Sequence, residues 1–276
     1  MLPDPLLVLL GIAVGTFGTL VGAGGGFVLV PLLALLEPTL ATAAITGVSL
    51  AVVAMNATSG ALAYARDRRI DYRSGIPFAI ATLPGSVLGA VATRYLERRW
   101  FDIAFAVLLL ALAGLLVRRG EATAPSETAE GGGRWRMARD LTDRAGTRHR
   151  YRVDLPLGVA VSFAVGFASS LLGIGGGVVH VPVLIGILGF PTHIATATSH
   201  FVLAIMATAG TITHVVSGDL AGLATQTVLL GVGAVIGAQI GARLSTRVHG
   251  LLIVRALALA LALVGLRLGA RSLFGL

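Results

Sequence analysis

The stretch GAGGGFVLVP at residues 22–31 returns, little changed, as GIGGGVVHVP at residues 173–182. Each copy is a glycine cluster followed by an apolar run that contains a proline. Three consecutive glycines are a poor helix interior, because each costs about 1 kcal/mol relative to alanine. Each copy therefore predicts a break between two apolar helices.

Apolar runs surround both copies. Hydrophobic residues make up 55% of the 276-residue chain and charged residues 12%, and the mean hydropathy is +0.89; a soluble domain carries about a quarter charged residues. The runs fall at residues 4–22, 26–37, 41–65, 74–94, 100–117, 155–172, 177–189, 192–217, 221–243 and 250–270. A span needs about 20 apolar residues, so the second run of each half is too short to cross alone. We therefore expect an all-α integral membrane protein with about eight to ten transmembrane segments, whose helices are broken or re-entrant at the glycine motifs.

The composition excludes several other classes of protein. The chain has no cysteine, which rules out disulfides and thiolate metal sites. Its net charge of +8 comes from arginines that cluster between the apolar runs, as the loop charges of a membrane protein do. We therefore expect a lipid bilayer and not nucleic acid as its partner, and we expect no cofactor.

The second half of the chain repeats the first. GTFGTLVGAGGGFVLVP at residues 15–31 aligns without a gap with GFASSLLGIGGGVVHVP at residues 166–182. Further matched pairs follow: Thr46 with Thr196, Ser49 with Ser199, Gly85 with Gly233, and Gly89 with Gly237. An odd number of crossings in each repeat would give the two repeats opposite orientations, which is the design of many secondary transporters. Duplication for stability alone is the alternative.

A hydrophilic stretch at residues 118–154 divides the two repeats. It contains proline, serine, threonine and a run of three glycines, which is typical of a flexible linker. It also holds many of the arginines, and arginine-rich loops lie on the cytoplasmic side of a membrane. We therefore expect a first membrane repeat at residues 1–117, a cytoplasmic linker at residues 118–154 and a second membrane repeat at residues 155–276.

The glycine breaks are the first candidates for a binding site. A broken helix inside a membrane leaves backbone groups unpaired unless protein, water or a ligand pairs them, so the break should face a cavity. The helix that restarts would point free N–H groups and the positive end of its dipole at this cavity, an arrangement that favours an anion. Close helix packing is the alternative, and we prefer it for Gly85, Gly89, Gly233 and Gly237.

Small neutral polar groups stand in the apolar runs, where charged residues would be costly. Ser49 and Ser199 occupy matched positions of the repeat, whereas His180 and His200 replace leucines. Hydroxyl and amide groups suit an oxyanion, and an imidazole can bind the anion or carry a coupled proton. Hydroxyls that bond to their own helix and buried structural histidines are the alternatives. The predicted substrate-binding residues are Gly24, Gly25, Gly26, Thr46, Ser49, Asn56, Gly175, Gly176, Gly177, His180, Thr196, Ser199 and His200.

Catalytic signatures are missing from the apolar runs. We find no HExxH sequence, no paired acidic motif and no set of nucleophile, base and acid. The prediction is therefore a transporter and not an enzyme, with a small anion as its substrate. An anion channel, and an intramembrane enzyme or assembly factor, are the alternatives.

The paired motifs resemble those of a known family. G-x-G-G-G-x-x-x-x-P at residues 22–31 and 173–182, each followed by T-x-x-S at residues 46–49 and 196–199, is similar to the TauE/SafE family of sulfite exporters and toluene-sulfonate uptake permeases. The resemblance implies a multi-pass permease of the bacterial inner membrane for small sulfur-containing anions such as sulfite, sulfonates or sulfoacetate. It also implies a bundle of two repeats driven by an ion gradient, with a proton or a cation as coupling partner. The long basic linker and His200 depart from the common pattern.

Overall fold

The structure is a computed structural model that describes residues 3–37, 39–120, 136–245 and 247–274. Its α-helices are α1 (Asp4–Leu20), α2 (Gly26–Leu36), α3 (Thr42–Arg66), α4 (Tyr72–Ala92), α5 (Arg98–Gly120), α6 (Leu155–Leu171), α7 (Gly177–Gly186), α8 (Thr192–Val216), α9 (Ala224–Ser245) and α10 (Gly250–Phe274). A short 3₁₀ helix, η1 (Thr93–Tyr95), extends α4, and the strands β1 (Arg136–Thr142) and β2 (Arg148–Asp154) form an antiparallel pair. The predicted all-α fold class is confirmed.

Each of the predicted apolar runs overlaps with one of these helices. Within the described residues, four helical stretches are long and apolar enough to cross a membrane, namely α3, α4 together with η1, α8 and α9. The helices α1 and α6 are also apolar but have only 17 residues each. They are shorter because the glycine motifs end them.

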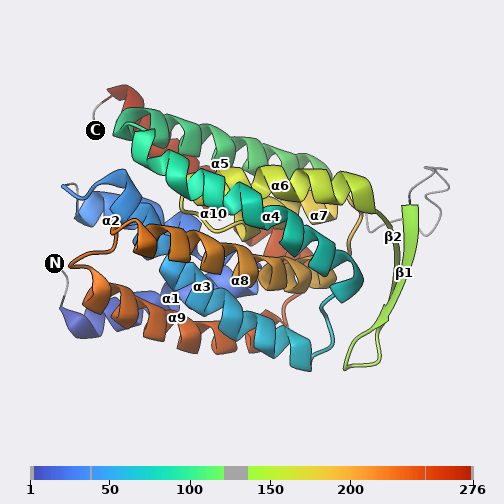
Figure 1. Cartoon of the computed structure of the whole chain (residues 1–276). Coiled ribbons are helices and arrows are strands. Elements are labelled where there is room, and N and C mark those ends of the chain that lie inside the picture. Colours follow the sequence, from blue (N-terminus) through green and yellow to red (C-terminus); the bar gives the residue numbers. More distant parts are fainter. Residues whose placement is uncertain (1–2, 38, 121–135, 246, 275–276) are drawn as a thin grey trace.

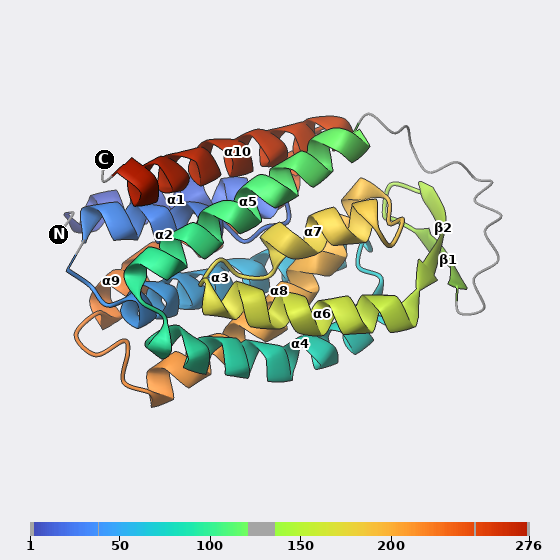
Figure 2. The same ribbon diagram turned by 90° about the horizontal axis from the view of Figure 1, so that it is seen from above.

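The two halves of the chain interlock around a central pair of helices. The helices α3 and α8 pack side by side and run in opposite directions (Figure 1). The first helix of each half packs against the fourth helix of the other half, α1 on α9 and α6 on α4. The helices α5 and α10 lie together along the top of the view in Figure 2. Each half is therefore held mainly by partners from the other half.

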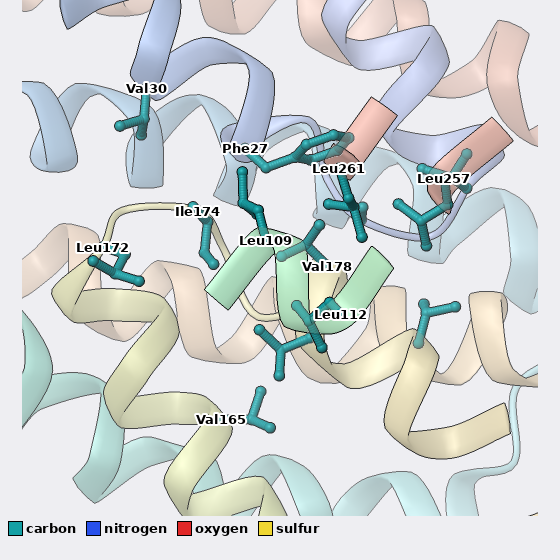
Figure 3. Close-up of a cluster of buried hydrophobic side chains, with 14 of the residues drawn as sticks. Phe27, Val30, Leu109, Leu112, Val165, Leu172, Ile174, Val178, Leu257 and Leu261 are labelled. Carbon is teal, nitrogen blue, oxygen red and sulfur yellow. The ribbon is translucent and has the colours of Figure 1, made fainter. Parts of the chain in front are cut away.

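The apolar core fills the space between the α5–α10 pair and the short helices α2 and α7. Phe27 of α2 and Val178 of α7 lie close to Leu109 of α5 and Leu261 of α10 (Figure 3), and all four side chains are buried. Ile174, from the segment before α7, belongs to the same cluster. This packing holds the segments that precede α2 and α7 inside the molecule.

Glycines let the paired helices touch. Four of them press against a backbone carbonyl of the neighbouring helix: Gly85 on Phe163, Gly89 on Phe167, Gly233 on Val8, and Gly237 on Ile12. A Cβ atom at any of these positions would overlap the carbonyl oxygen, so the helix axes approach this closely only with glycine. The predicted packing role of these glycines is confirmed.

The same contacts correct our alignment of the fourth segments. Gly85 packs on Phe163 and Gly237 packs on Ile12, and Phe163 and Ile12 occupy matched positions of the two repeats. Gly85 therefore corresponds to Gly237 and not to Gly233, a shift of one helical turn. The sequence alignment is wrong here because glycines recur at four-residue spacing along α9, so that either register matches.

The stretch that we predicted to be a flexible linker contains a β-hairpin. Residues 121–135 lie outside the described chain, and β1 and β2 follow them. Tyr151 and Val153 of β2 are buried, while Arg150 and Arg152 are exposed. This alternation is typical of a half-buried strand. It is easily missed in the sequence because arginines occupy the outward positions.

Candidate functional site

Each glycine motif interrupts a helix. The chain passes from α1 to α2 through residues 21–25, and from α6 to α7 through residues 172–176. We call these segments the first and second glycine turns. Every residue of both turns is buried. Both motifs therefore place irregular backbone inside the protein, where its polar groups depend on neighbouring helices.

The glycine spacing follows from the backbone conformation of the turns. Gly22 and Gly24 have φ angles of 76° and 74°, and the matched Gly173 and Gly175 have φ angles of 66° and 65°. This left-handed region is open to glycine but strained for residues with a Cβ atom. The G-x-G pattern of each motif therefore specifies a left-handed residue at both of its glycines, and in the first turn Gly25 is left-handed as well, with a φ angle of 82°.

The two turns touch each other. A Cβ atom on Gly26 would lie 2.5 Å from the carbonyl oxygen of Ile174, and one on Gly177 would overlap the carbonyl oxygen of Gly22. The last glycine of each triplet is thus a point of contact with the opposite turn. The structure therefore brings the two predicted glycine triplets together.

Serines of the central helices hold the turns crosswise. The hydroxyl of Ser49 on α3 donates to the carbonyl oxygen of Gly173 at 2.7 Å. The hydroxyl of Ser199 on α8 donates to the carbonyl oxygen of Gly22 at 3.3 Å. Each serine therefore holds the turn of the other half of the chain. We expected these hydroxyls to face an anion, whereas in this structure they donate to backbone carbonyls.

Thr46 and Thr196 contact the same glycines from one helical turn earlier. The hydroxyl of Thr46 donates to carbonyl oxygens of its own helix, and that of Thr196 donates to the carbonyl oxygen of His193 at 3.0 Å. A Cβ atom on Gly173 would lie 2.7 Å from the Cα of Thr46, and one on Gly22 would lie 2.8 Å from the Cα of Thr196. Both threonines therefore shape the turns through their backbones, while their hydroxyls bond within the helix.

Apolar side chains occupy the space beside the triplets. A Cβ atom on Gly24 would lie 2.5 Å from Leu203 Cδ2 and 3.0 Å from Val53 Cγ1, and one on Gly175 would lie 2.5 Å from Val53 Cγ1. The middle glycines also pack on apolar side chains, Gly25 on Val14 and Gly176 on Met206. We expected the glycine breaks to face a cavity. In this structure Val53 of α3 and Leu203 of α8 fill that place, so both turns are closed.

Asn56 ties three helices together. Its amide group donates to the carbonyl oxygens of Gly15 on α1 and Ala234 on α9, each at 3.1 Å. Its side-chain oxygen accepts the hydroxyl of Thr19 at 3.1 Å. Both amide hydrogens are therefore used within the protein. Asn56 fixes the position of α1, the helix that leads into the first glycine turn.

His200 lies beside the same helix. Its Nε2 is 3.2 Å from the hydroxyl of Thr19, and its ring meets the ring of Tyr64 edge-on, with centroids 5.7 Å apart. Tyr64 donates to the carbonyl oxygen of Thr19 at 2.7 Å. The Nδ1 atom of His200 is buried and has no hydrogen-bond partner among the described residues. A polar cluster of Thr19, Asn56, Tyr64 and His200 therefore stands next to the first glycine turn.

His180 makes its contacts elsewhere. Its Nε2 is 3.2 Å from the hydroxyl of Ser162 on α6, and its ring packs against Phe78 of α4, with centroids 5.8 Å apart. It therefore faces α4 and α6, and not the central serines. In the part of the chain that the structure describes, no group of three or more His, Asp or Glu side chains is placed to hold a metal ion.

Comparison with known proteins identifies the family. Residues 7–268 match the family described as sulfite exporter TauE/SafE. The chain belongs to the TauE/SafE family. It is 31% identical over 275 residues to the probable membrane transporter protein YunE of Bacillus subtilis (strain 168), with 98% of each chain covered.

More distant relatives agree. The chain is 31% identical to a probable membrane transporter protein of Xylella fastidiosa (strain 9a5c), over 69% of this chain and 64% of the relative. It is 26% identical to the probable membrane transporter protein MJ0441 of Methanocaldococcus jannaschii, over 76% of this chain and 72% of the relative. No solved structure matches the chain. This TauE/SafE protein is therefore a multi-pass membrane transporter.

Sequence reasoning missed several groups around the turns of this TauE/SafE protein. Thr19 joins His200 and Asn56, and Val53 and Leu203 close on the glycines. A signal was present in the repeat, because Val53 and Leu203 follow the matched serines by four residues each. Both are ordinary apolar residues, and composition could not show that they lie against the turns.

Proposed function

We propose that this TauE/SafE protein is a secondary transporter that moves a small sulfur-containing anion, such as sulfite, a sulfonate or sulfoacetate, across the bacterial inner membrane by alternating access. The observation that carries the proposal is the pair of hydrogen bonds between the halves. Ser49 of the first half binds the second glycine turn, and Ser199 of the second half binds the first glycine turn. A site built from two related halves can open toward either side as the halves move. Transport needs no covalent step, and we propose no catalysis.

The arrangement of the halves supports inverted repeats. The matched helices α3 and α8 are antiparallel (Figure 1), and the α1–α9 contact has its counterpart in the α6–α4 contact. Exchanging these matched contacts would turn a state open to one side into a state open to the other. We propose that the repeats are residues 1–117 and 155–276, and that residues 118–154 lie in the cytoplasm, where arginine-rich loops are retained.

The beginnings of α2 and α7 favour an anion. The first hydrogen bonds of α2 are donated by Val28 and Leu29 to Gly25, so the amides of Gly26 and Phe27 precede them. The matched residues of α7 show the same pattern. Such amides, with the positive end of the helix dipole, attract an oxyanion. We infer that the anion binds between the two glycine turns when the side chains of Val53 and Leu203, which pack against the turns, move away.

Purified protein tests the substrate class. We expect sulfite or sulfoacetate, and not simple carboxylates, to raise the unfolding temperature, because a ligand at about 100 times its Kd stabilises the folded state by about 2.7 kcal/mol. In proteoliposomes the same anion should accumulate against its own gradient when an ion gradient is imposed. Purely downhill flux would indicate an anion channel and would contradict the proposal.

A variant of the second turn locates the site. Gly176 has a φ angle of −52°, which leucine tolerates, and its Cβ atom would meet the flexible side chain of Met206 at 2.9 Å. Gly176→Leu should therefore fold and insert but place a bulky side chain at the start of α7, beside the amides that we propose bind the anion, and the ligand-induced rise in unfolding temperature should disappear. Gly114→Leu is the matched control, because nothing lies within 4 Å of its Cβ position. An undiminished rise in Gly176→Leu would place the anion elsewhere.

A further inference from the structure

The C-terminal end of α8 holds a chain of polar groups outside the proposed anion site. His214 is completely buried, and its Nδ1 is 2.8 Å from Oδ2 of Asp219 in the loop after α8. The other carboxylate oxygen of Asp219 accepts from the guanidinium of Arg94 at 2.9 Å. The Arg94 side chain is 39% exposed. The chain of polar groups therefore begins at the surface and leads into the helix bundle.

The second ring nitrogen of His214 faces Thr46 on α3. Nε2 is 3.5 Å from the hydroxyl of Thr46. That hydroxyl also lies 3.0 Å from the carbonyl oxygen of Ala43 and 3.1 Å from that of Thr42. When Nε2 has no proton, the hydroxyl can donate to it; when Nε2 is protonated, the hydroxyl can turn to a carbonyl and accept. The surroundings therefore accommodate both protonation states of the imidazole.

Asp219 determines which nitrogen gains the second proton. A carboxylate can only accept, so the hydrogen on Nδ1 is donated to Asp219 and Nε2 remains the basic atom. Burial would raise the pKa of Asp219, but hydrogen bonds from Arg94 and His214 hold it below its usual range. Asp219 therefore stays charged and can stabilise an imidazolium.

The charges around the ring come from two neighbouring segments. Among the described residues, the carboxylate of Asp219 and the opposing guanidinium of Arg94 on η1 are the charged groups that act on His214. From helix α3, the neutral residues Thr46 and Gly47 lie against it. The protonation of His214 therefore depends on its burial and on the balance between one carboxylate and one guanidinium.

This chain of polar groups, from Arg94 to Thr46, ends at the second glycine turn. Thr46 packs directly on Gly173, whose carbonyl oxygen is held by Ser49. A change in the hydrogen bonds of Thr46 therefore occurs beside a turn that would move during transport.

The first half of the protein lacks this chain. Tyr64 occupies the position that matches His214, and it donates to the backbone of Thr19. Thr196, which matches Thr46, donates to a carbonyl of its own helix. Histidine is the side chain whose ordinary pKa lies between pH 5 and 8. A group suited to proton exchange thus stands at this place only in the second half, and the symmetry of the repeat does not account for it.

We propose that His214 is a proton-binding site that couples movement of the anion to a proton gradient; this inference rests on the proposed transport function. The neutral imidazole takes up H⁺ at Nε2 while the face that carries Arg94 and Asp219 is open. The imidazolium releases the same H⁺ when the opposite face opens. Proton and anion therefore share one conformational cycle, and no other reactant takes part.

Nuclear magnetic resonance of the full chain tests proton binding directly. The chain has six histidines, so ¹⁵N-histidine labelling gives few signals, and His214 is assigned by the signals that His214→Gln removes. We expect its Nε2 signal to change between about pH 5 and pH 8 while its Nδ1 keeps its hydrogen. A ring that stays in one protonation state over this range would overturn the proposal.

Proteoliposomes test the coupling. In the wild type, sulfoacetate uptake should carry protons inward, detected with an internal pH dye. His214→Gln and Asp219→Asn should lower this proton flux about tenfold or more, which lies within the roughly 5- to 150-fold range of typical coupling between sites. Sulfoacetate exchange should continue in both variants. His249→Gln, an exposed histidine, is the matched control.

The outcomes separate the two proposals. If sulfoacetate uptake in His214→Gln still carries protons as in the wild type, the coupling role is wrong. If the wild type moves no sulfoacetate, the proposed substrate is wrong for that anion, and the titration of His214 alone decides whether the proton site exists.

Discussion

The hydroxyl of Ser49 satisfies a carbonyl that a broken helix leaves free. Gly173 lies in a buried turn, so its carbonyl oxygen has no access to water and depends on this donor. Ser199 does the same for Gly22 over a longer distance, 3.3 Å against 2.7 Å. Removing either hydroxyl leaves a buried acceptor unpaired, which costs more than the bond itself contributes.

Ser49→Ala should lower the free energy of unfolding by about 1–3 kcal/mol, and Ser199→Ala by less, because its bond is longer. Thermal unfolding in detergent measures both. Thr208→Val is the control, since within the described residues this exposed hydroxyl bonds only to Ala204 of its own helix; we expect a change within about 0.5 kcal/mol. Equal losses in Ser49→Ala and Thr208→Val would show that the serine does not hold the turn.

Close approach of α4 and α6 depends on residues without side chains. A Cβ atom on Gly89 would overlap the carbonyl oxygen of Phe167 and lie 2.9 Å from the amide nitrogen of Leu171. Backbone atoms cannot yield as a flexible side chain can. The sequence predicted the packing role of Gly89. It did not identify the matching glycine of the second repeat, because glycines one turn apart fit either register.

Gly89→Ala should lower the free energy of unfolding by about 1–3 kcal/mol, since α4 and α6 must separate to admit the methyl group. Gly114→Ala on α5 meets nothing within 4 Å and should be neutral or stabilising by up to about 1 kcal/mol. Thermal unfolding of the two variants provides the comparison. Indistinguishable melting temperatures would remove Gly89 from the helix contact.

The β-hairpin joins parts of the molecule that are distant in sequence. It lies at the end of the bundle opposite the start of α1 (Figure 1). The phenol of Tyr151 donates to the carboxylate of Asp71 at 2.9 Å, and the backbone amide of Asp71 donates to Thr198 of α8 at 3.0 Å. Burial and the Asp71 carboxylate raise the pKa of Tyr151, so the phenol stays protonated and keeps donating. Asp71 therefore connects the hairpin and the start of α4 through its carboxylate, and α8 through its backbone amide.

Tyr151→Phe should loosen the hairpin, because a buried hydrogen bond to a charged group contributes about 1.5–3 kcal/mol. Hydrogen exchange of the amides of residues 136–154 should accelerate roughly tenfold to a hundredfold, at about 1.4 kcal/mol for each factor of ten. Arg150→Gln is the control, because this exposed side chain of the same strand forms a surface ion pair with Asp140, and surface pairs contribute little. Unchanged exchange in Tyr151→Phe would mean that other contacts hold the hairpin.

Local sequence was enough to define the apolar helices, the two interruptions and the repeat that relates them. These features depend on composition and on glycine, whose effects act within a few neighbouring residues. The β-hairpin was not predicted, because arginines alternate with the buried apolar residues of β2 and hide their pattern.

The partners of the buried polar groups were decided only by the packed structure. Ser49 and Gly173 are 124 residues apart, and Ser199 and Gly22 are 177 apart. Hydroxyls, carbonyls and apolar side chains compete for the space around the turns, and only the distances in the folded chain show which of them meet. The serines therefore bind carbonyls here, and Val53 and Leu203 close on the glycines.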